Sequence, residues 1–144
     1  MEPPITQWLL IFTHVRGQSF FIRLVQFIQG TLPSRYNHIH MVGFDGYIEQ
    51  WVCVDWNLNG LHVLILKPEQ ISRLLRACRK QEGAILQCPI SNVHWKFPVT
   101  PLYCVSIAKF LIGYKSFNPF QTPWGFYKTL VKKGYKYFYK PKVR

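Results

Sequence analysis

The pattern of apolar and polar positions predicts a strand followed by a helix at the start of the chain. Residues 8–15 (WLLIFTHV) are a short apolar run rich in residues that favour strands, so we expect a buried strand there. Residues 19–30 are apolar on most faces and lie between Ser19, a good helix N-cap, and Gly30, a common helix end. This segment therefore predicts a buried or half-buried helix.

A meander of three strands is predicted next. Two strand-like runs, residues 37–44 and 47–54, flank an Asp-Gly pair of the kind found in tight hairpin turns. Residues 55–60 have the composition of a turn, and the apolar residues 61–67 predict a third strand.

The length of the hairpin turn decides which side chains share a face, because neighbouring residues of a strand point to opposite sides. A two-residue turn would place Glu49 on the face of His38 and His40, and a turn one residue longer would place Gln50 there instead. Both alternatives stay open. Asp55 is expected to form the turn that follows.

The second half of the chain shows helical periodicity. Residues 68–83 predict an amphipathic helix, since they carry one apolar stripe at helical spacing: Ile71, Leu74, Leu75 and Cys78. Residues 84–90 predict a further strand. Thr100 and Pro101 then open a predicted helix that ends at Gly113, and another Thr-Pro pair precedes a short helix.

This order of elements predicts an α+β domain, in which helices pack on a small antiparallel sheet. A chain of 144 residues has the size of one domain, and its 49% hydrophobic residues are typical of a folded protein. We assign residues 1–130 to this domain and residues 131–144 to a basic, aromatic C-terminal tail.

Charge is distributed unevenly along the chain. The formal net charge is +12, and no acidic residue follows Glu82. The C-terminal basic residues alternate with aromatic ones, which suits nucleic acid, phosphate or an anionic membrane surface, although a solvated tail has the same composition. The candidate anion-binding residues are Lys128, Lys132, Lys133, Lys136, Lys140, Lys142 and Arg144.

The four cysteines lack a CxxC pair, so neither a zinc pattern nor a compact disulfide framework is predicted. The N-terminus has an acid and two prolines where a signal peptide has lysines, and no apolar run reaches the ~20 residues needed to span a bilayer. We expect a protein made and folded in a cytoplasm, without a transmembrane segment, metal or cofactor.

Cys104 is the cysteine best placed to act as a nucleophile. A reactive thiol is favoured by a helix N-terminus and a neighbouring imidazole, and Cys104 alone falls in the first turn of a predicted helix. Cys78 lies on an apolar stripe, and Cys53 and Cys88 end strands. The competing interpretation of Cys104 is a buried core residue.

His38 and His40 are the candidate bases, because alternate residues of a strand project to one face. If that face meets the helix of Cys104, either imidazole reaches the thiol, and Glu49 or Gln50 would orient it. The sequence shows no third ligand at metal spacing beside the two histidines. The remaining histidines, His14, His62 and His94, are given no role.

The order of these motifs resembles that of circularly permuted papain-like peptidases and acyltransferases, the NlpC-like and lecithin:retinol acyltransferase-like group. The similar segments, within roughly residues 17–130, are FIRLVQFIQGTLPSRYNHIHMV, DGYIEQ and YCVSIAKFLIG. A later segment, TPWGFYKTL, resembles versions associated with bacteriophages.

The resemblance implies a permuted papain-like topology with Cys104 as nucleophile and His38 as base. Its orienting position falls on Glu49 or Gln50, and IEQ resembles the family's IEA, which favours Glu49. His40 lies where the family has a small or apolar residue. Tyr103 is a departure, since Asn or Asp is common before the cysteine.

The implied activity is that of a cysteine amidase, peptidase or acyltransferase that acts through a thioester, on cell-wall peptide crosslinks or on a lipid or protein acyl group. The alternative is a non-enzymatic module, packaged in a virion, that binds DNA or other virion proteins through its basic residues. Membrane attachment through residues 20–28 ranks lower, because this segment is apolar rather than two-faced.

Overall fold

The computed structural model describes residues 5–14, 35–57, 59–91, 103–116, 118 and 120–142. Its strands are β1 (Gln7–Thr13), β2 (His38–Asp45), β3 (Gln50–Asn57), β4 (Gly60–Leu66), β5 (Ala84–Pro89) and β6 (Lys136–Tyr139), and its helices are α2 (Pro68–Lys80), α3 (Cys104–Ile112) and α4 (Pro123–Lys132). The predicted α+β class is confirmed. The helix predicted at residues 19–30 lies outside the described residues.

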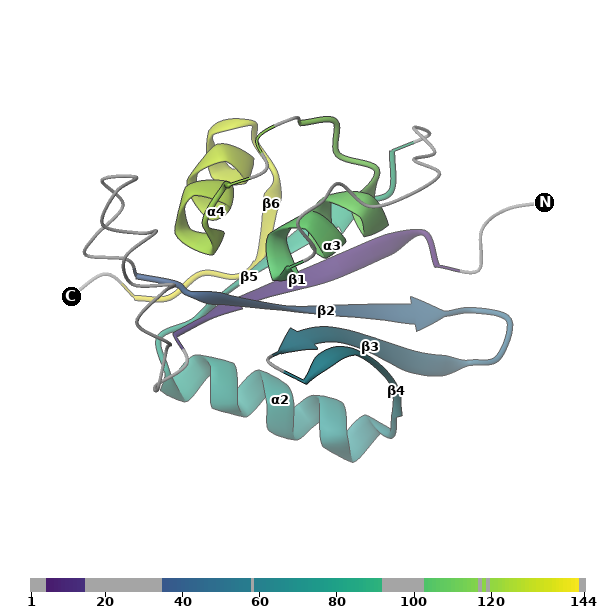
Figure 1. Cartoon of the computed structure of the whole chain (residues 1–144). Helices are drawn as coiled ribbons and strands as arrows, with labels where there is room; N and C mark the ends of the chain where they lie inside the picture. The colour runs from purple at the N-terminus through teal and green to yellow at the C-terminus, as the bar shows by residue number, and fades with distance from the viewer. Residues whose placement is uncertain are drawn as a thin grey trace.

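The strands form one antiparallel sheet in the order β4-β3-β2-β1-β5-β6. Helix α2 covers one face, and α3 and α4 cover the other (Figure 1). Alternate residues of β1 serve the two layers: Leu10 packs in the core beneath α3 and α4, whereas Leu9 packs in a smaller core with Ile71 and Cys78 of α2. Among the described residues, no helix has the length and apolar character to cross a membrane.

The turn between β2 and β3 is longer than either predicted alternative. Asp45 pairs with Gln50, so residues 46–49 form a four-residue turn. The Asp45 carboxylate stabilises this turn by accepting hydrogen bonds from the backbone N–H groups of Tyr47 (2.9 Å) and Ile48 (3.3 Å). Glu49 closes the turn with a positive φ of 52°.

The extent of β3 corrects the prediction for Asp55. Strand β3 continues to Asn57, so Asp55 lies within the strand, directly opposite His40 of β2, and not in a turn. The connection from β3 to β4 is correspondingly short, because Asn57 already pairs with Gly60.

Part of the segment predicted as a tail belongs to the sheet. Residues 136–139 form β6, which pairs with β5 and makes the second edge of the sheet. The Tyr137 hydroxyl also contacts the Tyr127 hydroxyl of α4 at 2.6 Å. The folded domain therefore extends past residue 130.

Candidate active site

Cys104 is the first residue of α3. Tyr103 before it is extended (φ −161°, ψ 175°) and acts as the N-cap, and its N–H donates to Oγ of Ser106 at 2.9 Å. The first N–H groups of a helix have no partner inside the helix, and the dipole there favours negative charge. Helix α3 begins at the cysteine, and Thr100 and Pro101, at which a helix start was predicted, lie outside the described residues.

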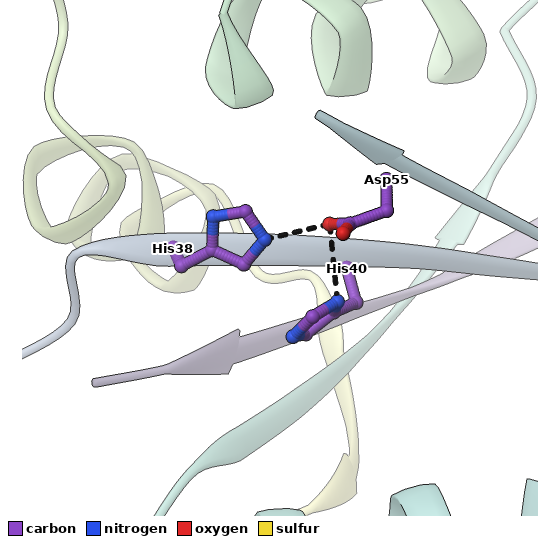
Figure 2. A group of neighbouring side chains, drawn as sticks. All are labelled: His38, His40 and Asp55. Carbon is purple, nitrogen blue, oxygen red and sulfur yellow. Dashed lines mark hydrogen bonds and ion pairs between the residues drawn. The ribbon is translucent and has the colours of Figure 1, made fainter. Parts of the chain in front are cut away.

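His38 lies at the start of β2, next to Asp55 of the neighbouring strand. Its Nε2 is 2.6 Å from Oδ1 of Asp55 (Figure 2), and the Cys104 thiol is near enough to the ring to raise the pKa of the imidazole. Because Asp55 engages Nε2, Nδ1 is the ring nitrogen left to exchange a proton with the thiol. Of the two histidines, His38 is the one whose pKa Cys104 raises.

His40 approaches the same carboxylate oxygen as His38. Its Nδ1 is 3.2 Å from Oδ1 of Asp55, and the two imidazoles meet edge to face with ring centroids 4.5 Å apart (Figure 2). Sheet register produces this arrangement, because Asp55 lies directly across from His40. The group is partly buried, with side-chain exposures of 15%, 24% and 20% for His38, His40 and Asp55.

The positive charge of His38 and the negative charge of Asp55 stabilise each other. Burial opposes the charged form of His38, but hydrogen bonds with Asp55 and Cys104 outweigh it and raise the pKa of the imidazole to about 9. Burial likewise opposes ionisation of Asp55, yet hydrogen bonds from His38 and His40 hold the pKa of its carboxyl well below the usual range. At neutral pH the pair is therefore an imidazolium and a carboxylate.

Neither Glu49 nor Gln50 orients the histidine, which corrects the prediction. Both are exposed at the turn end of the hairpin, where Gln50 pairs with Asp45. Asp45 is seven residues from His38 along β2, a distance of roughly 20 Å at the usual strand rise. Asp55 fills the orienting position instead.

All four cysteines are buried, Cys104 included, and burial raises the pKa of the other three. Burial raises the pKa of Cys53 and of Cys78 to about 11 and that of Cys88 to about 12. Asp55 adds to the effect at Cys53, and Arg79 partly opposes it at Cys78. These thiols remain protonated and weakly nucleophilic at neutral pH.

The group in Figure 2 also has the composition of a metal site. The ligand atoms of His38, His40 and Asp55 lie within 4.8 Å of one another, the one such set found in the described part of the chain. Asp55 is thus a third candidate ligand beside the two histidines, which sequence analysis did not reveal, and the set suits zinc. The same atoms already satisfy one another by hydrogen bonds.

His62 of β4 extends this row across a third strand. It is the direct partner of Asp55 on the side away from His40, and its Nε2 is buried without a hydrogen-bond partner. Sequence analysis assigned no role to His62. The pairing of His62 with Asp55 is the signal that would have indicated its place beside the histidines of β2.

The candidate anion-binding residues lie on α4, β6 and the chain around them. Lys128, Lys132, Lys133, Lys136, Lys140 and Lys142 are exposed, and Arg144 lies outside the described residues. Three of them lie over aromatic rings: Lys128 over Trp124, Lys133 over Tyr114 and Lys140 over Tyr137. Lys128 and Lys132 also line a hollow of about 610 Å³ beside α4.

Comparison of the chain with models of known protein families, with curated proteins and with solved structures found no match. The geometry of the site and the motifs of the sequence are therefore the basis for a functional assignment.

Proposed function

We propose that this chain is a cysteine-dependent amidase, peptidase or acyltransferase with a permuted papain-like, NlpC-like topology. One observation carries the proposal: the His38 imidazole of β2 is hydrogen-bonded to the Asp55 carboxylate of β3, and the Cys104 thiol of α3 is near enough to raise the pKa of this imidazole. Nucleophilic catalysis by cysteine uses a thiol, a base beside it and a third polar group that orients the base.

The reaction begins with attack of the Cys104 thiolate on an acyl carbon. The His38 imidazolium then gives its proton to the leaving amine or alcohol, and a thioester remains on the sulfur. Water or a second acceptor attacks the thioester while neutral His38 accepts its proton, which releases the acyl group and restores the thiolate–imidazolium pair. Backbone N–H groups at the start of α3 are the donors for the oxyanion.

Two further features support this assignment. The cysteine opens a helix that packs on the sheet and follows the histidine strand in the sequence, as in the resemblance described above. The third member comes from the strand next to that of the histidine. A cell-wall peptide crosslink acted on in a phage context is the substrate that the resemblance favours, and a lipid or protein acyl group is its alternative.

The experiment is measurement of alkylation rates at pH 7 by iodoacetamide and peptide mass spectrometry. Because burial keeps the other three cysteines protonated, we expect Cys104 to react at least about 100-fold faster than Cys53, Cys78 or Cys88. Substitution of His38 by alanine should abolish this advantage while far-UV circular dichroism stays unchanged. Similar slow rates at all four thiols would refute the proposal.

A non-enzymatic polyanion-binding protein is the second candidate function. The exposed lysines of α4 and β6, with aromatic rings beneath three of them, favour it. Binding of nucleic acid by a protein whose Cys104 is unreactive would support this candidate over the first.

A further inference from the structure

Strand β4 forms one edge of the sheet, with β3 on one side and no strand of the described residues on the other. It is seven residues long and has no charged side chain (GLHVLIL). Leu61, Val63, Leu64 and Ile65 are each 50–62% exposed, and they point alternately to both faces. An apolar edge of this length leaves a row of backbone donors and acceptors open to pairing.

The opposite edge shows the protection that β4 lacks. Strand β6 has four residues, includes Lys136, and is followed by Lys140 and Pro141. Its pairing with β5 also contains an irregularity between Ile85 and Leu86. Short length, lysine, proline and bulges are the usual means by which proteins prevent edge pairing. The contrast indicates that the β4 edge is kept for an interaction.

The exposed apolar surface extends from β4 to the neighbouring turn. Seven of the nine large hydrophobic side chains that are exposed in the described residues lie here, and we name them the edge patch: Phe44, Tyr47, Ile48, Leu61, Val63, Leu64 and Ile65. At about half exposure they present roughly 600 Å² of surface, close to the ~800 Å² that each partner contributes to a standard interface.

We propose that two copies of the chain associate through antiparallel pairing of their β4 strands about a two-fold axis at Val63. Val63 is the middle residue of β4, so this register pairs the whole strand and places Leu61 opposite Ile65 of the partner subunit. The edge patch has no charge although the chain carries +12. Lys67 falls opposite Asn59 of the partner subunit, so like charges do not meet.

This dimer does not depend on the proposed function. Sedimentation equilibrium should give the wild-type chain a mass twice its 17.1 kDa. Val63→Lys should give the monomer mass, because two lysines would then meet at the axis. Phe138→Lys on β6 is the matched control, since it adds the same charge to an exposed residue of the other edge strand, and it should remain a dimer. A monomeric wild type, or loss of the dimer in Phe138→Lys alone, would overturn the proposal.

Oxidative crosslinking tests the register without disturbing the apolar edge. Cys104, the proposed nucleophile, is replaced by serine in both variants, the other three native cysteines are buried, and directly paired strand residues have the Cα separation of a disulfide. Val63→Cys should therefore form a covalent dimer on mild oxidation. Leu61→Cys should not, because its copies would lie four residues apart along the paired strands. Equal crosslinking of the two variants, or none in either, would contradict pairing about Val63.

Discussion

A single carboxylate oxygen of Asp55 contacts the imidazoles of both His38 and His40. Its bond to His38 is the shorter one, 2.6 Å against 3.2 Å for His40, so His38 is the stronger partner. His40 contacts the carboxylate from a second direction and helps to fix its orientation. We infer that His40 acts as a positioning residue.

Substitution of Asp55 by asparagine should slow alkylation of Cys104 by at least about tenfold. An amide cannot stabilise an imidazolium as a carboxylate does, so the pKa of His38 should fall from about 9 and the thiolate should lose its counter-ion. Glu49→Gln makes the same chemical change at the exposed turn and should leave the rate unaltered. The opposite ranking of these variants would restore Glu49 as the orienting residue.

The stability of the fold should fall between about pH 6.5 and 9. The pKa of His38 is raised from 6.5 to about 9 in the folded chain, so its contribution is complete below pH 6.5 and disappears as the pH passes the folded value. Urea unfolding at pH 6 and pH 9.5 measures this loss. His38→Gln should show a smaller difference between the two pH values, and an equal difference would place its origin elsewhere.

Residues with strong local sequence signals were assigned to the correct secondary-structure elements, whereas Asp55 was not. Gly113 ends α3 as predicted, and His38 lies in a strand as the alternating pattern predicted, because both signals are local. Asp55 was assigned to a turn because residues 55–60 have the composition of a turn. Its role depends on pairing with β2, which no local pattern encodes.

At the scale of elements, the register of the hairpin explains why an acidic residue still faces the histidines although the wrong residue was predicted. The observed pairing is offset by four residues from the two-residue turn, since Phe44 pairs with Trp51 and not with Tyr47. An even offset keeps every side chain on its predicted face. An acid of the neighbouring strand therefore still faces the histidines, but it is Asp55, six residues beyond Glu49.

Helix ends were predicted where a side chain acts locally. The Thr122 hydroxyl caps α4 by accepting from the Gly125 N–H at 3.1 Å, and Gly113 ends α3 in the left-handed region at φ 68°. Strand β6 was missed because it has only four residues, one of them lysine. Its partner β5 lies almost fifty residues earlier, so only the folded chain reveals the pairing.

At the scale of the whole molecule, the positive charge of the C-terminal part lies on folded structure. Lys132 and Lys133 end α4, and Lys136 and Lys140 lie on and beside β6. Deletion of residues 132–144 would remove an edge strand and the contact between Tyr127 and Tyr137. Charge must therefore be removed by substitution if anion binding is to be separated from folding.

The quadruple variant Lys132→Gln, Lys133→Gln, Lys136→Gln and Lys140→Gln should weaken binding to single-stranded DNA, measured by fluorescence anisotropy. If each lysine neutralises one phosphate, the slope of log K against log salt should fall by about 3, since each contact contributes about 0.7. The matched control replaces four exposed basic residues on and beside α2: Lys67, Arg73, Arg76 and Lys80. Equal losses in both variants would show that binding follows net charge alone, whereas a loss confined to the first would locate the anion-binding surface on α4 and β6.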